Sequence, residues 1–353
     1  MLSIIVPTYN ERDNIEELIR RVGKSLDGVE YEVIVVDDNS PDGTAEVAEG
    51  LSKEFPVRVV RRPSKLGLAS AVLEGFKASR GDYVVVMDAD LQHPPELIPK
   101  MYEYALKGYE LVIASRYVFS GSVSGWGFTR RLISKTAIIL AKLLIPKTRG
   151  VKDPLSGFFL IKRDSLVGVG LSPRGFKILL ELLVKGRYVR VYEVPYHFSV
   201  RLRGKSKLSF KELMNYLLHV ITLSPYNTLL KFLIVGSLGT IINLGVLYLL
   251  RYLVGLEHVV SSALAIEASV INNYSLHERW TFRERRLGNW VHRLLKFHIT
   301  TSLAITTQYV TSQILHYVSG LESVLSQFVG ILLGFTINYV LSKRYVWSGG
   351  KGA

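Results

Sequence analysis

Short apolar runs alternate with segments of helical periodicity along the first third of the chain. Five β-branched or apolar runs predict strands, at residues 2–6, 31–36, 57–60, 83–87 and 111–114. Residues 14–25 have the period of an amphipathic helix, and a second helix is expected from Asp42 or Thr44, as its cap, to Phe55. Because alternating strands and helices form βαβ units, this pattern predicts an α/β fold with a largely parallel sheet.

The last 130 residues or so follow a different pattern, in which long, weakly charged apolar runs replace the short ones. They lie at residues 229–250, 259–276, 297–318 and 324–342. Since about 20 apolar residues cross a bilayer as a helix, the four runs predict four transmembrane helices. The second run is short and includes Glu267, which is either functional or a partner in helix pairing.

The same region repeats itself. Lys231-Phe232 recurs as Lys296-Phe297, and Asn273 to Arg279 recur as Asn338 to Arg344, both at an offset of 65 residues. An internal repeat of this length indicates a duplicated unit. The sequence therefore predicts an all-α membrane domain of two repeats at residues 228–347.

Two basic amphipathic segments precede the predicted membrane domain, at residues 130–145 and 208–223. Helices of this kind can lie in the membrane interface, although both could instead pack on the first domain with solvated lysines. We therefore expect a first domain at 1–205 that includes the interfacial helix at about 130–145. An interface helix and linker follow at 206–227.

The net charge of +14 can indicate that the protein binds or lies against a negatively charged partner. No nucleic-acid-binding motif is present, so anionic lipid head groups or a topological bias are the better explanations. The stretch between the predicted second and third spans is strongly basic, with Arg279, Arg283, Arg285, Arg286, Arg293 and Lys296. Because basic loops face the cytoplasm and no signal peptide is visible, we expect a multi-pass membrane protein with its first domain and both termini cytoplasmic.

Candidate chemistry begins directly after the strand predicted at residues 83–87. Asp88, Asp90 and Gln92 alternate along the chain, so they can project together from the carboxyl end of that strand. Ligand sites of open α/β sheets lie at this edge. Their oxygen atoms suit Mg²⁺ or Mn²⁺ holding a diphosphate, and the alternative is a solvated acidic loop. The chain has no cysteine, which excludes thiolate metal sites and disulfides.

Three motifs at strand ends together resemble those of family 2 glycosyltransferases: IIVPTYNE at 4–11, VVDDNSPDGT at 35–44 and DAD at 88–90. Within that family, DPLSGF at 153–158 and RLRGKSK at 201–207 are similar to the polyprenyl-phosphate sugar synthases, above all those that make dolichyl phosphate mannose. The resemblance covers about residues 1–225 and implies a Rossmann-like GT-A fold and an inverting sugar transfer. The C-terminal region resembles the GtrA-like membrane domain.

The resemblance also implies roles for individual residues in nucleotide-sugar binding. Pro7, Tyr9, Glu11 and Asp38 would line the base pocket, with Val36 at its floor. Asp88 and Ala89 would lie near the ribose, and Asp88, Asp90 and Gln92 would hold Mn²⁺ or Mg²⁺. Lys177 would also reach this site. The residues expected to bind the nucleotide sugar are thus Pro7, Tyr9, Glu11, Val36, Asp38, Asp88, Ala89, Asp90, Gln92 and Lys177.

A phosphate acceptor fits the basic residues of the first domain. A phosphate monoester has its second pKa at about 6 and is already largely dianionic, so it needs cations rather than a general base. Arginine forks suit phosphate oxygens. By resemblance, the acceptor phosphate would meet Arg116, Arg130, Ser134, Arg201 and Lys207, and Asp90, Arg116 and Arg130 would be the catalytic residues.

The expected reaction moves mannose from GDP-mannose to dolichol phosphate at the bilayer, giving dolichyl β-D-mannosyl phosphate. One alternative is a transferase of the same family that uses UDP-glucose or another donor, or another polyprenyl phosphate. A second is a lipid-linked sugar transporter or flippase with a degenerate transferase domain. The intact Asp88 and Asp90 pair argues against degeneracy. The donor sugar and the oligomeric state stay open.

Overall fold

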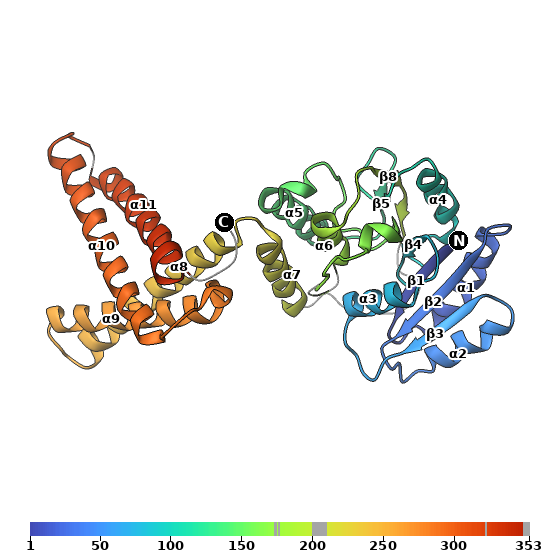
Figure 1. Cartoon of the computed structure of the whole chain (residues 1–353), viewed down its shortest axis with the longest axis horizontal. Helices are drawn as coiled ribbons and strands as arrows, with labels where there is room; N and C mark the ends of the chain where they lie inside the picture. Colours follow the sequence, from blue (N-terminus) through green and yellow to red (C-terminus); the bar gives the residue numbers. More distant parts are fainter. Residues whose placement is uncertain (173–174, 176, 200–209, 322, 349–353) are drawn as a thin grey trace. The chain divides into compact units, whose positions relative to one another are not determined.

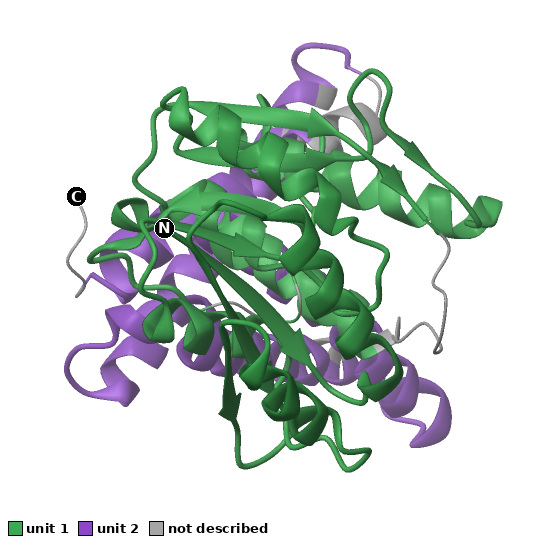
Figure 2. Cartoon of the chain, turned by 90° about the vertical axis from the view of Figure 1, so that its right-hand side faces the viewer, with its two compact units in different colours: residues 1–225 green, residues 226–353 purple. Residues whose placement is uncertain are grey.

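The computed structural model of the chain describes residues 1–172, 175, 177–199, 210–321 and 323–348. Contacts divide the chain into two compact units, residues 1–225 and 226–353 (Figure 2). The first unit is an α/β structure and the second is helical (Figure 1).

A seven-stranded sheet forms the centre of the first unit, in the order β3-β2-β1-β4-β7-β5-β8. Strands β1 to β4 pair in parallel, and β5 pairs in parallel with β8. Strand β7 is antiparallel to both of its neighbours, β4 and β5. The predicted α/β fold is confirmed, with one antiparallel strand inserted. The strands are β1 (Leu2–Thr8), β2 (Tyr31–Asp37), β3 (Val57–Arg61), β4 (Tyr83–Val86), β5 (Leu111–Ser115), β7 (Phe159–Lys162) and β8 (Val191–Pro195).

Helices cover both faces of this sheet, because the central strands are apolar on both sides. Alternating residues of β1 show the division: Ile4 faces the core beneath α1, α2 and α4, whereas Ile5 faces the core beneath α3 and α6. The loops between strands and helices therefore lie at the two ends of the strands. The helices are α1 (Arg12–Ser25), α2 (Thr44–Gly50), α3 (Leu68–Ala78), α4 (Ile98–Leu106) and α6 (Ile178–Lys185).

The two predicted amphipathic segments form helices α5 (Phe128–Leu144) and α7 (Phe210–Leu223). They share a small apolar cluster in which Ile138 of α5 meets Tyr216 of α7, and the Tyr216 hydroxyl donates to the Ala137 carbonyl at 2.5 Å. Other apolar side chains of α5 stay exposed, among them Phe128, Leu132, Ile139 and Leu143. Helix α5 therefore packs partly on the first unit and also keeps an apolar face that no described residue covers. A short two-stranded sheet pairs β6 (Ser122–Val123), which precedes α5 in the chain, with β9 (His197–Phe198), which follows it.

The second unit contains α8 (Asn227–Tyr248), α9 (His258–Leu276), α10 (Trp290–Tyr317) and α11 (Ser323–Leu341), with α8 packed on α9 and α10 on α11. All four predicted apolar runs are thus helical. Among the described residues, one helix, Asn227–Leu253, is apolar and long enough to cross a membrane. Four spans stay a prediction.

The sequence repeat recurs in the structure of the second unit. The α9 and α11 helices each end in a π-helical turn, His277–Thr281 and Ser342–Val346. The residues that follow, Phe282 and Trp347, stack with ring centroids 4.5 Å apart. Equivalent residues of the two repeats therefore meet in one aromatic cluster. Glu267 of α9 pairs with His298 of α10 at 3.0 Å, which supports helix pairing as its role.

Candidate active site

The carboxyl ends of β1, β2 and β4 lie side by side at one edge of the sheet. Thr8 is in register with Asp37, and Ile5 with Val86. Since parallel strands end at the same edge, the three motifs at 4–11, 35–44 and 88–90 are brought to one edge by the fold.

Asp37 fastens the first two of these strand ends together. Its carboxylate is buried and accepts hydrogen bonds from the hydroxyls of Thr8 at 2.9 Å and Ser40 at 2.6 Å. The backbone N–H of Ser40 donates to its second oxygen at 2.8 Å. Asp37 is thus an anchor for the loop after β2.

Asp38, predicted to line the base pocket, is held by an arginine that sequence reasoning missed. Arg62 donates to one oxygen of Asp38 at 2.5 Å, and the Gly67 N–H donates to the other at 2.9 Å. Both charged side chains are buried. Gly67 has φ +99°, which glycine alone adopts without strain. A basic residue directly after β3, the neighbour of β2, is the signal that could have revealed this partner.

The first motif continues into a loop in which Tyr9 and Glu11 are held from different sides. The ammonium of Lys65 lies 3.8 Å from the centre of the Tyr9 ring. Glu11 accepts from the Asn14 side chain at 2.8 Å, and its own N–H donates to Thr44 at 3.0 Å. Two further predicted residues, Pro7 and Val36, are buried within their strands. Val36 belongs to the core beneath α3 and α6.

Asp88 is positioned by a buried histidine. The Asp88 N–H donates to Nδ1 of His93 at 3.0 Å, so this nitrogen carries no proton and the imidazole is neutral in this arrangement. Burial lowers the pKa of His93, which also favours the neutral ring. His93 stacks on Phe158 with centroids 5.2 Å apart. The Asp88 side chain itself is 36% exposed, so it reaches the surface of the site.

Asp90 and Gln92 lie one turn further on and are buried, as is Ala89. The Gln92 N–H donates to Asp90 at 3.2 Å. The Gln92 side-chain amide donates to the Ser199 carbonyl at 2.7 Å, so Gln92 connects this turn to the segment after β9.

These donors fit a hard divalent cation in part. Asp88 and Asp90 supply carboxylate oxygens, the ligands that Mg²⁺ and Mn²⁺ prefer. Within the described residues, no group of three or more His, Cys, Asp or Glu side chains could hold a metal ion. A metal here would therefore take its other ligands from a bound diphosphate and water, as Mg²⁺ commonly does.

Arg116, predicted as a phosphate ligand, forms a buried bidentate pair with Asp153. Its Nε and Nη2 each donate to an Asp153 oxygen at 2.8 Å, and its backbone N–H donates at 3.1 Å. Although burial opposes its charge, hydrogen bonding to Asp153 raises the pKa of the Arg116 guanidinium above its ordinary value. One edge of the guanidinium is thus bound to Asp153. The sequence showed Asp153 as part of the DPLSGF motif but did not predict that it pairs with Arg116.

Arg116 and Arg130 both lie against Trp126, a residue that the sequence did not single out. The guanidinium carbons lie 5.5 and 4.5 Å from the centre of the indole. The indole N–H is buried and has no hydrogen-bond partner among the described residues. Ser134, one helical turn beyond Arg130, is hydrogen-bonded to the Tyr117 hydroxyl at 2.9 Å. Three of the five predicted acceptor residues are therefore grouped around one aromatic side chain and its neighbours.

Lys177 joins this group from the start of α6. Its ammonium donates to the Leu155 carbonyl at 2.9 Å. Burial, and then the positive charge of Arg116, lower its pKa to about 8, whereas Asp153 and Asp88 oppose the shift. The charges of Asp88, Arg116 and Arg130 therefore all act on the Lys177 ammonium. Arg201 and Lys207 fall outside the described residues.

Replacing Asp153 with Asn should destabilise the first unit strongly. The change leaves Arg116 buried without a full counter-charge, which costs about 3–5 kcal/mol in such pairs. We expect the unfolding temperature of the full-length protein in detergent to fall by on the order of 10 °C. An Arg116→Leu/Asp153→Leu double variant should lose less stability than the sum of its single variants. Strict additivity would contradict a coupled pair.

Comparison with known protein families finds two matches that divide the chain. Residues 3–169 match glycosyl transferase family 2, and residues 231–347 match the GtrA/DPMS transmembrane domain. The second match supports a membrane location for the protein.

Similar proteins cover between about three fifths and nearly all of the chain. A dolichol-phosphate mannosyltransferase of Pyrococcus furiosus is 45% identical, over 98% of this chain and 99% of its own. One from Saccharomyces cerevisiae is 40% identical, over 61% of this chain and 84% of its own. The crystal structure of a mycobacterial protein aligns with a TM-score of 0.50 and 25% identity, over 64% of this chain and 74% of that chain. The sheet of the first unit is thus of the GT-A, Rossmann-like kind.

Proposed function

We propose that this chain, which belongs to the dolichol-phosphate mannosyltransferases of glycosyltransferase family 2, transfers mannose from GDP-mannose to dolichol phosphate. A phosphate oxygen of the acceptor attacks the anomeric carbon, the bond to the diphosphate breaks, and GDP leaves. Inversion gives dolichyl β-D-mannosyl phosphate. The observation that carries the proposal is that the segment 153–158 connects the acidic pair to the cations. Asp153 pairs with Arg116, and the Leu155 carbonyl accepts a hydrogen bond from Lys177. Phe158 stacks on His93, which accepts from the Asp88 N–H.

On the donor side, the loops after β1 and β2 would bind the nucleoside. Tyr9 and Glu11 offer a ring and a carboxylate, and Asp38 offers a carboxylate that Arg62 orients by a hydrogen bond. Asp88, Asp90 and Gln92 would hold Mn²⁺ or Mg²⁺ on the diphosphate. When bound, the cation would neutralise charge that develops on the leaving GDP. Lys177 supplies a further positive charge near Asp88.

On the acceptor side, no general base is required. The phosphate must be held against a negatively charged donor, and Arg130, Ser134 and the uncommitted edge of Arg116 would do so, with Arg201 and Lys207. The buried indole N–H of Trp126 adds a donor that has no hydrogen-bond partner among the described residues. Because Trp126 contacts both arginines, it would also keep their guanidinium groups at a fixed spacing.

The lipid tail of the acceptor requires the site to face a membrane. The exposed apolar residues of α5, Phe128, Leu132, Ile139 and Leu143, recur at helical spacing and would lie in the bilayer interface. In the second unit, α8 to α11 would each cross the bilayer. Basic residues gather between α9 and α10 and after α11, so these ends, both termini and the first unit would be cytoplasmic.

A panel of nucleotide sugars tests the donor assignment. Purified full-length protein is given dolichol phosphate, Mn²⁺ and either GDP-mannose, UDP-glucose or GDP-glucose, and the lipid product is identified by mass spectrometry. We expect product from GDP-mannose at a rate at least about tenfold above the others. Product from UDP-glucose alone would overturn the assignment of donor but leave lipid-phosphate transfer intact.

Residues 1–225 alone should retain the chemistry. This unit contains its own cores and every residue assigned to the transfer. Removing the second unit takes away lipid positioning rather than catalytic groups, so KM for dolichol phosphate should rise more than kcat falls. Steady-state kinetics in detergent separates the two. A folded fragment that binds GDP yet shows no transfer at saturating acceptor would contradict this division.

A further inference from the structure

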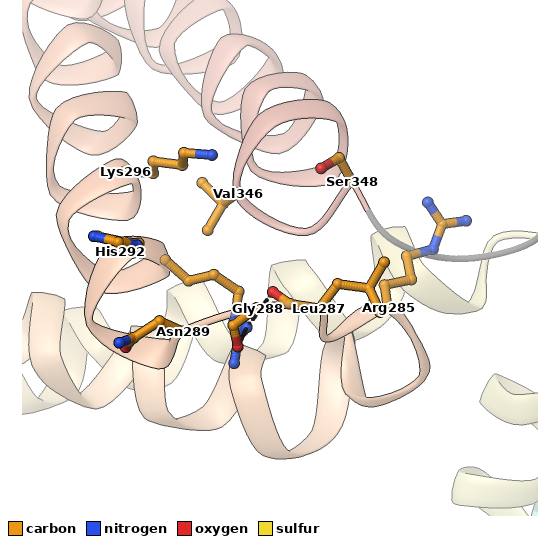
Figure 3. Close-up of a pocket in the computed structure, with 9 residues that line it drawn as sticks. Arg285, Leu287, Gly288, Asn289, His292, Lys296, Val346 and Ser348 are labelled. Atoms are coloured by element: carbon orange, nitrogen blue, oxygen red, sulfur yellow. Dashed lines mark hydrogen bonds between the residues drawn. The ribbon is translucent and has the colours of Figure 1, made fainter.

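A small cavity in the second unit is lined by none of the residues assigned to sugar transfer. It has a volume of about 160 Å³ and lies between the turn at 285–289, the first turns of α10 and the residues after α11 (Figure 3). Arg285, His292 and Lys296 line it together with Asn289 and Ser348. The ammonium end of Lys296 points toward the segment that carries Val346 and Ser348 (Figure 3).

The charge of this cavity is not balanced by its lining. Of the cations there, Arg293 is already used: it forms a bidentate pair with Glu278, at 2.6 and 3.1 Å, and donates to the carbonyls of Leu287 and Gly288. Within the part of the chain that the structure describes, no Asp or Glu is among the lining residues. Arg285 and Lys296 thus bring two positive charges without a lining counter-charge.

Ring stacking and hydrogen bonds form the frame around the cavity. Phe282 and Trp347 stack with ring centroids 4.5 Å apart, and the indole N–H of Trp347 donates to Glu278 at 2.8 Å. Asn289 caps the start of α10 by accepting from the Val291 N–H at 2.8 Å. The positive end of a 28-residue helix therefore adds to the basic side chains.

Size limits what this cavity can hold. Sites for whole small molecules enclose about 300–1,000 Å³, so 160 Å³ is too small for a nucleotide sugar. It is large enough for a compact anion. Arginine, lysine and serine side chains beside a helix amino terminus are the donors that bind phosphate oxygens.

We propose that this cavity binds a phosphate group, carried either by the head group of an anionic phospholipid or by free phosphate. Its oxygens would meet the Lys296 ammonium and the Ser348 hydroxyl, and Arg285 and His292 add a positive charge and a hydrogen-bonding ring at the rim (Figure 3). The proposal does not depend on the transfer reaction, because no residue of the first unit takes part.

The test compares binding by the full-length protein in a phosphate-free maltoside detergent. Native mass spectrometry or thermal shift is followed while phosphatidylglycerol, phosphatidylcholine or inorganic phosphate is added. The variant is Arg285→Gln/Lys296→Gln. The control is Arg283→Gln/Arg286→Gln, which removes the same charge from exposed residues of the same segment that do not line the cavity.

Each lost charge should weaken binding about fivefold, so the cavity variant should bind phosphatidylglycerol roughly 30-fold more weakly, with the control nearly unchanged. The same loss seen with inorganic phosphate would assign the site to a free anion, and a loss confined to phosphatidylglycerol would assign it to a lipid head group. Equal weakening in both double variants, or none in either, would overturn the proposal. Because sugar transfer is not measured, failure here is distinct from failure of the proposed function.

Discussion

Asp90→Ala should abolish mannosyl transfer, with a loss of at least about a thousandfold. Asp90 is buried at the turn after β4 and is the carboxylate best placed, with Asp88, to join a divalent cation to the diphosphate. Losing one preorganised group that stabilises transition-state charge costs about 10²–10³, and losing the metal with it costs more. EDTA should have the same effect on the wild type, and added Mn²⁺ should restore activity.

The control for this prediction is Asp82→Ala, at the opposite end of the same strand. Asp82 is exposed and pairs with the N-terminal ammonium, so its removal should leave transfer unchanged. Turnover is measured as mannosyl lipid formed, and calorimetry gives the affinity for GDP in Mn²⁺. Normal turnover in Asp90→Ala would remove Asp90 from the site.

Arg130→Ala should slow transfer by about a hundredfold while leaving GDP binding nearly intact. Its guanidinium is held over Trp126 at 4.5 Å and would bind the acceptor phosphate with a charge-assisted contact. Arg130→Lys should rescue poorly, because a point charge does not replace a planar fork. Arg130 is a cleaner probe than Arg116, whose removal also leaves Asp153 buried without its partner.

The neighbouring Arg131 provides the matched control. It is exposed on the same helix, so Arg131→Ala removes the same charge while leaving the Trp126 contact intact. A collapse of GDP affinity in Arg130→Ala with normal dependence on acceptor would move Arg130 to the donor side. An equal loss in both variants would point to general attraction of α5 to anionic surfaces.

The sequence predicted the fold where the apolar pattern was long. Strands β1, β2 and β4 stand out because each holds at least four consecutive apolar or β-branched residues and ends in a polar motif. Strand β7 does not stand out, because it is only four residues long, Phe159–Lys162, and directly follows a turn-forming motif. Its antiparallel position between β4 and β5 comes from tertiary pairing that no local pattern records.

The candidate site shows a similar division. Acidic residues at the end of β4 could be found because alternation along a strand places them on one side. The partners of charged residues could not, because Arg116 and Asp153 are 37 residues apart and Asp38 and Arg62 are 24 apart. Burial is what requires each of these charges to be paired, and it follows from packing rather than from sequence. Trp126 likewise gains its place from Phe198 and from the two arginines that lie against it.

The most direct test of the central claim follows labelled mannose from GDP-mannose in the presence of purified full-length protein, dolichol phosphate and Mn²⁺. The label should move to the lipid in equal amount to the GDP released, and NMR of the product should show a β-linked mannosyl phosphate. Release of GDP with free mannose, transfer with retained configuration, or no lipid product with any nucleotide sugar would contradict the account.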